Sequence, residues 1–439
     1  MADSYSRGGY MMSTYGPAAS GVPPERGASN DRQAETLARR VSSDLDAGSL
    51  GGPASVQKMY RRDVPAPGLD RSDLQRSEAS SPSVGTSSDH EIPTISVIIA
   101  TKRRANYLEP LIDAVLSDPG ALEVIIVIDA LDDFESHSVL AGLGERDGRL
   151  IYFCAPPGSQ FIKLQRGVAA ARGEVVLLLD DDVLPTCDLA TGHARRHGTR
   201  DDLVVVGSMP ISDDLRMGVA SRIYSESYDE HCRSMLETNL SVLDYLWGGN
   251  FSLRRDRCLD VGVFSPSFAA HYHADRDFGY RLADAGLVGV FDPSLSAIHL
   301  HSRPPEAFLR DARAQGEGFE LLHRLHSDRL GPFTLRKLNN TVPYPAYFIL
   351  QIVSLTGTSV AASWVFMTLG ILAGKLRFHS LETVLAKMAQ HLAQLQGVNG
   401  SRRGRNIPGA DSGHRKTAEL NSMAFWPRLK RWSGRSTVR

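Results

Sequence analysis

The chain has 439 residues, of which 42% are hydrophobic and 23% charged, as is ordinary for a globular protein of one or two domains. The 49 Lys and Arg residues nearly balance the 50 Asp and Glu residues, which argues against a nucleic-acid binder with a basic patch. The four cysteines are widely spaced and indicate reduced thiols rather than a zinc site or disulfide framework. Since the first 20 residues lack the apolar core of a signal peptide, we expect a cytoplasmic protein.

The two ends of the chain differ in composition from the middle. Residues 1–92 are rich in Ser, Gly, Pro, Arg and Asp and show little hydrophobic periodicity, so they cannot bury enough apolar surface to offset the entropy cost of ordering. Residues 400–439 are basic and low in apolar residues. We therefore expect a disordered N-terminal tail over residues 1–92 and a loose C-terminal tail over residues 400–439.

The middle of the chain alternates between two kinds of pattern. Short apolar runs predict buried strands at residues 95–100, 123–128, 150–154, 174–179 and 203–207. Periodic segments predict helices at residues 106–116, 160–171, 275–285 and 304–325. This alternation predicts an α/β fold with a mostly parallel sheet. Ligands bind such sheets beyond the carboxyl ends of the strands, which places residues 100–104, Asp129 and Asp180–Asp182 along one crevice.

Three consecutive carboxylates, Asp180–Asp182, follow the fourth apolar run. Charged groups at the end of a buried strand cost desolvation free energy unless a cation neutralises them. Carboxylate oxygens are preferred ligands of Mg²⁺ or Mn²⁺, which bind one or two carboxylates together with substrate phosphates. A solvated turn is the alternative, but the position at the predicted crevice favours a metal site.

The chain resembles the family 2 glycosyltransferases, which have the GT-A fold, a Rossmann-like fold of nucleotide-diphospho-sugar transferases. The resemblance rests on six segments that follow the order of the family's motifs, at residues 96–104, 124–129, 165–182, 247–255, 275–282 and 292–301. Any one of these motifs is weak, but six in sequence are specific. The resemblance implies metal-dependent transfer of a sugar from a nucleotide-diphosphate donor to a hydroxyl acceptor, with inversion at the anomeric carbon.

The resemblance also implies roles for individual residues. The residues implied to bind the nucleotide-sugar are Thr101, Asp129, Arg166, Asp180 and Asp181. Those implied to hold Mg²⁺ or Mn²⁺ are Asp180, Asp182 and His299. The acceptor side would be formed by Trp247, Gly248, Gly249 and Asn250. Interpretations without a role in catalysis stay open for three of these residues: a surface position for Arg166, and purely structural roles for His299 and Trp247.

Asp275 stands at the start of the predicted helix 275–285 and is the candidate general base. Attack by an acceptor hydroxyl requires a positioned carboxylate that removes its proton, and the resemblance implies this role for Asp275. The alternative is that Asp275 merely caps the helix, because Asp is favoured at that position. Asp277, in the first turn, is interpreted as a structural partner of the helix dipole.

Three positions depart from the family's motifs. Lys102, Ala130 and Ala274 stand where Tyr, Asp and Glu are usual, which leaves the nucleobase of the donor open. These departures also keep open a catalytically inactive, membrane-tethered scaffold of the same fold. A nucleotidyltransferase is a further alternative, but no Gly-rich triphosphate loop follows the first strand.

Residues 342–373 contain no Asp, Glu, Lys or Arg, and this stretch exceeds the roughly 20 residues that span a bilayer. Basic residues flank it on both sides, whereas a single span predicts asymmetry. We expect a re-entrant or interfacial pair of helices at the cytoplasmic face of a membrane, with a single span or a buried helix as alternatives. Such a site would suit a lipid-linked or cell-envelope glycan acceptor. The predicted organisation is therefore a GT-A domain over residues 93–327 and a helical, membrane-associating region over residues 328–399.

Overall fold

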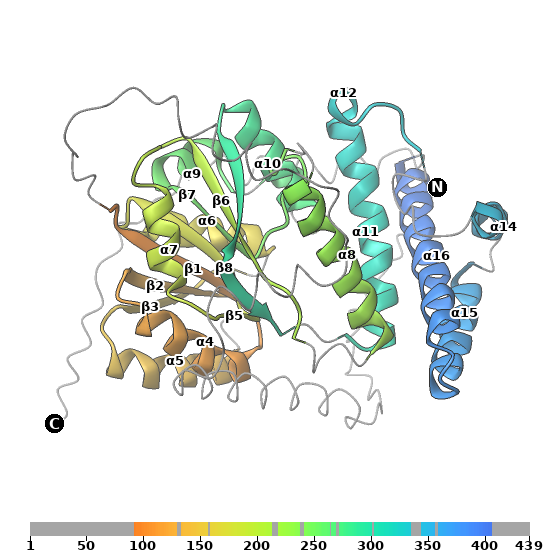
Figure 1. Cartoon of the computed structure of the whole chain (residues 1–439), viewed down its shortest axis with the longest axis horizontal. Helices are drawn as coiled ribbons and strands as arrows, with labels where there is room; N and C mark the ends of the chain where they lie inside the picture. Colours follow the sequence, from red (N-terminus) through yellow and green to blue (C-terminus); the bar gives the residue numbers. More distant parts are fainter. Residues whose placement is uncertain are drawn as a thin grey trace, which may run out of the picture.

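The computed structural model shows an α/β domain beside a column of long helices (Figure 1). It describes residues 92–129, 133–156, 159–212, 218–237, 241–263, 265–268, 272–300, 303–334, 344–355 and 359–405. The predicted N-terminal tail, apart from Ile92, and the C-terminal tail beyond Arg405 lie outside the described residues.

The described strands form one mixed sheet in the order β3-β2-β1-β4-β7-β6-β8-β5. Their bounds are β1 Ile95–Thr101, β2 Ala121–Ile128, β3 Leu150–Cys154, β4 Val175–Asp180, β5 Val183–Pro185, β6 Leu203–Ser208, β7 Asn250–Arg254 and β8 Val288–His299. Strands β3, β2, β1 and β4 are parallel, whereas β7 is antiparallel to β4 and β6, and β5 is antiparallel to β8. The α/β class is confirmed, but only the first half of the sheet is uniformly parallel.

Helices cover both faces of the sheet. On one face lie α4 (Ala105–Ser117), α5 (Phe134–Arg146) and α7 (Leu189–Arg196), and on the other lie α6 (Gln160–Ala170), α9 (Arg255–Val261) and α10 (Ala274–Asp284). Alternate residues of a strand point to opposite faces, so Val97 and Ile99 of β1 join the first core while Ile98 and Ala100 join the second. Because both faces are buried, the strands read as continuous apolar runs.

A column of helices stands beyond the sheet domain (Figure 1). It consists of α8 (Val219–Glu237), α11 (Pro305–Leu325), α12 (Ser327–Leu330), α14 (Tyr344–Leu355), α15 (Ser359–Lys375) and α16 (His379–Arg405). The short 3₁₀ turn η2 (Pro266–Phe268) shares a small apolar cluster with α10 and α11. Helix α16 packs between α11 and α15. None of the described helices has both the length and the hydropathy of a membrane span.

Two glycines allow α11 and α16 to approach closely. A Cβ atom on Gly316 of α11 would lie 2.0 Å from the carbonyl oxygen of Gln394, and one on Gly397 of α16 would lie 2.0 Å from that of Arg313. Only a residue without a Cβ fits at such a backbone contact. The predicted domain boundary after residue 327 therefore separates two helices, α11 and α16, that pack tightly against each other.

We expect Gly316→Ala to lower the free energy of unfolding by about 1–3 kcal/mol, because the added methyl group overpacks this helix contact. The matched control is Gly142→Ala on α5, where an added Cβ meets nothing within 4 Å. That control should be neutral or slightly stabilising, since Ala is the better helix former. Urea unfolding of both variants checks the expectation, and equal stabilities would contradict the close packing of α11 on α16.

Candidate active site

The carboxyl ends of β1, β2 and β4 bring the predicted donor-side residues together. Thr101 ends β1, Asp129 follows β2 and Asp180 ends β4, and β1 pairs with both of the other strands. The hydroxyl of Thr101 donates a hydrogen bond to Oδ2 of Asp181 over 2.8 Å. The crevice at the strand ends that the sequence predicts is therefore lined by these polar side chains.

Arg104, the N-cap residue of α4, supplies a cation to the acidic cluster. Its Nη1 atom lies 2.7 Å from Oδ1 of Asp181 and 2.6 Å from Oδ2 of Asp182. Burial alone would lower the pKa of Arg104, but the two carboxylates outweigh burial and raise it. The sequence predicts that Arg104 lies in the crevice but does not predict a role for it. Only the packing of α4 shows that its side chain reaches these carboxylates.

Negative charge in the cluster still exceeds what Arg104 neutralises. Burial and the neighbouring carboxylate of Asp182 raise the pKa of Asp180 to about 7, and burial raises the pKa of Asp181 as well. The amide of Gln160 donates a hydrogen bond to Oδ1 of Asp180. Uncompensated carboxylates of this kind are suited to binding a further cation.

His299, at the end of β8, lies beside Asp182. The antiparallel pairing of β5 with β8 sets Val183 opposite His299, and Nε2 of His299 is 3.3 Å from Oδ1 of Asp182. The other ring nitrogen, Nδ1, lies 3.1 Å from the hydroxyl of Tyr224, a residue of α8 that the sequence did not single out. This contact orients the imidazole, as partners of metal-binding histidines commonly do.

The described residues contain no group of three His, Cys, Asp or Glu side chains arranged to hold a metal ion. Asp182 and His299 form a pair, and Asp182 turns Oδ1 toward His299 and Oδ2 toward Arg104. Mg²⁺ and Mn²⁺ commonly take only one or two protein side chains, with phosphates and water completing the shell. The pair therefore fits a cation that is bound together with a phosphate-bearing ligand.

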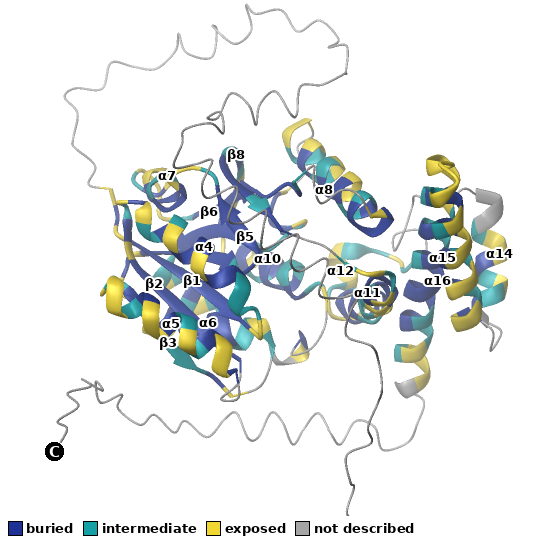
Figure 2. Cartoon of the chain, turned by 90° about the horizontal axis from the view of Figure 1, so that it is seen from below, coloured by how far each residue is buried: buried dark blue, intermediate teal, exposed yellow. Residues whose placement is uncertain are grey.

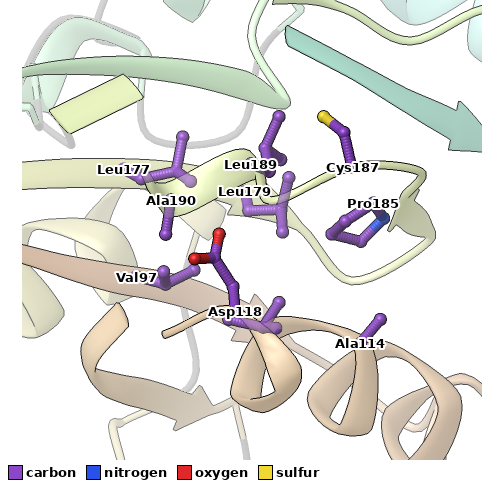
Figure 3. A pocket seen from close by; sticks show the side chains of 10 residues that line it. Val97, Ala114, Asp118, Leu177, Leu179, Pro185, Cys187, Leu189 and Ala190 are labelled. Atoms are coloured by element: carbon purple, nitrogen blue, oxygen red, sulfur yellow. The ribbon is translucent and has the colours of Figure 1, made fainter. Parts of the chain in front are cut away.

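A basic cavity of about 250 Å³ opens beside Asp182. It is lined by Lys102, Arg103, Arg104, Asn106, Tyr107, Asp182, Leu300 and Arg303. Four of these side chains are cationic, so the cavity suits an anionic group such as a diphosphate. The pocket drawn in Figure 3 is different: it lies between α4 and α7 among mostly apolar side chains, with the Asp118 carboxylate among them, and has no room for a water molecule.

Asp129 is held by two lysines. Nζ of the buried Lys163 lies 2.8 Å from Oδ1 of Asp129, and Nζ of Lys102 lies 2.5 Å from Oδ2. Lys163 belongs to α6, on which the predicted donor ligand Arg166 is exposed to solvent. The surface alternative for Arg166 therefore agrees with the structure, and Lys163 is the cation that α6 brings to the site. The signal that could have identified Lys163 is its position four residues before Gly167, a glycine that packs on the sheet.

The loop before β7 connects the acidic cluster to Asp275. The backbone N–H of Gly248 donates to Oδ2 of Asp275 over 3.1 Å, and the carbonyl of Gly249 accepts from the N–H of Asp180 over 3.0 Å. Gly249 has a φ of 114°, and a Cβ there would lie 2.9 Å from Oδ2 of Asp180. The loop thus requires glycine at this position, and it places the two predicted sides of the site next to each other.

Asn250 differs from the prediction that it belongs to the acceptor side. Its side chain is fully buried. Its amide donates to the carbonyls of Ser208 and Leu295 over 3.2 and 3.1 Å, and its Oδ1 lies 3.1 Å from Nε2 of His193. Since buried amides need partners, Asn250 ties β7 to β6, β8 and α7 and does not face an acceptor.

Trp247 is half-buried and packs edge-on against two tyrosines of α8. Its ring centroid lies 5.4 Å from that of Tyr224 and 5.3 Å from that of Tyr228. Tyr224 in turn contacts His299, so one aromatic wall runs from the acceptor-side loop to the histidine. Trp247 is therefore partly a packing residue, although it is not fully buried.

Asp275 is not the cap of α10. The N-cap residue is His273, which has a φ of 70°, and Asp275 lies in the first turn with its carboxylate directed at Gly248. Burial raises the pKa of Asp275 despite hydrogen bonds from backbone N–H groups. Asp277 has a structural role, since its buried carboxylate lies 2.9 Å from Nε of Arg281 and 2.8 Å from Nε2 of His326.

Comparison with known proteins identifies the domain. Residues 96–261 match the sequence model described as glycosyl transferase family 2, and no curated protein matches the chain significantly. This stretch runs from β1 through the acidic cluster to the end of α9, and Asp275 and His299 lie beyond it.

Three solved structures resemble the chain weakly. The mannosyltransferase PcManGT from Pyrobaculum calidifontis, in complex with GDP-Man and Mn²⁺, is 14% identical, with 82% of this chain and 97% of that chain covered and a TM-score of 0.45. GalNAc-T7 with UDP, GalNAc and Mn²⁺ is 12% identical over 55% and 52% of the two chains, with a TM-score of 0.39. A mycobacterial protein is 18% identical over 60% and 81%, with a TM-score of 0.35. These likenesses are too low to transfer a donor, a metal or an acceptor. Through residues 96–261, the chain carries a glycosyl transferase family 2 domain and is a glycosyltransferase.

Proposed function

We propose that this crevice transfers a sugar from a nucleotide-diphosphate donor to a hydroxyl acceptor, with inversion at the anomeric carbon. The observation that carries the proposal is that one loop joins two groups of side chains that suit different parts of the reaction. A basic cavity and an acidic cluster meet at Asp182, and the loop at residues 247–249 links that cluster to a separate carboxylate, Asp275. The first part suits a diphosphate, and the second suits proton removal from an acceptor.

On the donor side, Asp182 and His299 would hold Mg²⁺ or Mn²⁺, which would neutralise the negative charge that grows on the departing diphosphate. The raised pKa of Asp180 supports this assignment, because it comes from burial and from the neighbouring Asp182 carboxylate, and a bound cation would offset both effects. Arg104 would bind the diphosphate together with the other three cations of the basic cavity, since its guanidinium lies in the wall of that cavity. Guanidinium groups bind phosphate oxygens through charge-assisted hydrogen bonds.

On the acceptor side, Asp275 would act as the general base. The acceptor oxygen forms a bond to the anomeric carbon as the bond from that carbon to the diphosphate oxygen breaks. The hydroxyl proton passes to the Asp275 carboxylate, and the electron pair of the broken bond leaves on the diphosphate. The N–H of Gly248, 3.1 Å from Oδ2, orients the carboxylate, and a raised pKa makes it a stronger base near neutral pH.

The pH dependence of kcat/KM follows from this role. Asp275 must be deprotonated to accept a proton, so we expect kcat/KM to fall as the pH drops through its pKa. Because burial raises that pKa, the fall should begin above the usual range of an Asp side chain, which is centred at about 3.9. A pH–rate profile with circular dichroism at each pH checks this, since the protein must stay folded. A profile that is flat down to about pH 4 contradicts the assignment.

The proposed function is tested by donor hydrolysis without an acceptor. We expect slow, Mn²⁺-dependent release of a nucleoside diphosphate from at least one of a panel of UDP-, GDP- and dTDP-sugars. A scaffold without activity would release nothing from any donor. A nucleotidyltransferase would instead release pyrophosphate when it is given a nucleoside triphosphate and a sugar phosphate. Either of these results contradicts the proposal.

A further inference from the structure

Helix α15 has an inverted distribution of side chains. Its face toward α16 carries small or flexible buried residues, namely Ser359, Ser363, Met367, Gly370 and Ala373. Its outward face carries exposed large apolar residues, namely Val360, Trp364, Val365, Leu369 and Leu372. A helix at a water-exposed surface normally places its polar side chains outward. The chain has no charged residue between Ser359 and Gly374, so the outward face of α15 is not built for water.

Neighbouring segments extend this apolar surface. Helix α14 exposes Phe348, Ile349 and Ile352, and the turn into α16 with the first turns of that helix exposes Leu376, Phe378, Leu381 and Val384. Across the three helices, the exposed fractions range from 39% for Trp364 to 67% for Ile352. Figure 2 shows α14 and α15 at the end of the molecule farthest from the sheet. We call these residues of α14, α15 and 376–384 the apolar face. Helices α14 and α15 both pack against α16, which gathers these exposed residues at one end of the molecule. Soluble monomers rarely expose large apolar patches without a binding partner.

The charges around the apolar face indicate which partner it suits. Lys375 and Arg377 are exposed at its border, and the chain contains no acidic residue from Tyr344 to Leu381. The nearest acid, Glu382, is buried and lies 2.5 Å from Nη2 of Arg222. A surface that is apolar and basic complements anionic headgroups, to which each basic residue contributes about 1 kcal/mol. A second copy of the same face would offer no negative charge to meet these cations.

We propose that the apolar face docks onto the surface of an anionic lipid bilayer and lies in its interface. Helix α15 has 17 residues, which at about 1.5 Å per residue gives about 25 Å, less than the roughly 30 Å of a bilayer core. Two short apolar helices side by side suit shallow insertion, in which an apolar face enters the boundary between headgroups and acyl chains. Trp364 adds an aromatic ring of the kind enriched at that boundary. The cytoplasmic side of the membrane, expected from the sequence, stays a prediction.

Docking at this face would orient the proposed active site, a consequence that rests on the proposed function. Helix α15 packs on α16, and α16 is held against α11 by the contacts at Gly316 and Gly397. Just after α11, His326 contacts Asp277 of α10, the helix that carries Asp275. The acceptor side of the crevice is thus connected to the apolar face through packed helices. A bilayer-bound protein would present Asp275 at a constant position relative to the membrane, as an acceptor anchored in lipid requires.

Cosedimentation of the full chain with vesicles tests the docking. We expect the protein to pellet with phosphatidylcholine vesicles that contain phosphatidylglycerol, and to pellet less with phosphatidylcholine alone. The double variant Val365→Glu with Leu372→Glu should lower the partition coefficient by at least about tenfold, because two exposed apolar side chains become charged. The matched control is Phe134→Glu, which changes an exposed apolar residue of α5 in the sheet domain and should leave binding unchanged.

Two outcomes would overturn the proposal. One is that the double glutamate variant binds the vesicles as well as the wild type does, or that the wild type does not bind them. The other is an oligomer of the wild type in gel filtration that the double variant converts to monomer, because a second copy would then be the occupant. Vesicle binding by Asp275→Asn separates this proposal from the proposed function. That variant should dock like the wild type whether or not Asp275 is the catalytic base.

Discussion

Replacing Asp275 with Asn is expected to lower kcat by about 10²–10⁴-fold, the usual contribution of a general base, while nucleotide binding stays nearly unchanged. Asn keeps the size of the side chain and can accept the hydrogen bond from the N–H of Gly248, but it cannot take up a proton. Binding should persist because Asp275 belongs to the acceptor side of the loop and the acidic cluster is intact. Turnover at saturating donor and calorimetric titration with the nucleoside diphosphate check the two parts.

The control for Asp275→Asn is Asp284→Asn. Asp284 is exposed on the same helix, and its carboxylate lies 3.0 Å from Nη2 of Arg329, away from the crevice. It should retain nearly full turnover. If Asp275→Asn retained wild-type kcat, the general base would have to be another group, and the assignment of the acceptor side would be wrong.

Replacing Asp182 with Asn is expected to abolish metal-dependent nucleotide binding. Asp182 turns one carboxylate oxygen toward His299 and the other toward Arg104, so the change removes negative charge from both contacts. We expect the Kd for the nucleoside diphosphate with Mn²⁺ to rise by about two orders of magnitude, about 2.8 kcal/mol at 1.4 kcal/mol per tenfold. Calorimetry with and without a chelator measures the effect, and the chelator should bring the wild type to the affinity of the variant.

Asp188→Asn serves as the control for Asp182→Asn. It removes the same charge six residues along the chain, where Asp188 is exposed at the start of α7 and its side chain makes no capping hydrogen bond. Its affinity should match that of the wild type. Asp182→Asn binding the diphosphate with Mn²⁺ as tightly as the wild type does would remove Asp182 from the cation site.

The residues that the sequence located well are those at the ends of continuous apolar strands. Asp129 and Asp180 could be placed because parallel strands end at one edge of a sheet, a property visible in local patterns. Helices α5, α7 and α8 escaped prediction for a physical reason. Helix α5 buries Ser136, α7 buries His193, and α8 buries Ser221 and Ser225, so none of the three shows an uninterrupted apolar stripe.

Contacts between distant segments could not be inferred from local patterns. Arg104, Lys163 and Tyr224 approach the site only because α4, α6 and α8 pack at particular angles. The resemblance implies an acceptor-side role for Asn250 beside two glycines, but Asn250 begins β7, and pairing with its neighbours turns its side chain into the interior. The uncharged stretch 342–373 predicts a pair of helices, but only the structure gives the bounds of α14 and α15 and shows which of their residues stay exposed.

Crystals grown with Mn²⁺ and a nucleoside diphosphate would test the central claim most directly, through anomalous scattering from manganese. The proposed site predicts one strong anomalous peak, from a manganese ion bound by an Oδ atom of Asp182 and by Nε2 of His299. The diphosphate should lie in the basic cavity beside Arg104. Asp275 should remain free of the metal, across the loop at residues 247–249. A diphosphate bound in this cavity with no manganese at Asp182, or manganese and nucleotide bound elsewhere on the protein, would contradict the proposed site.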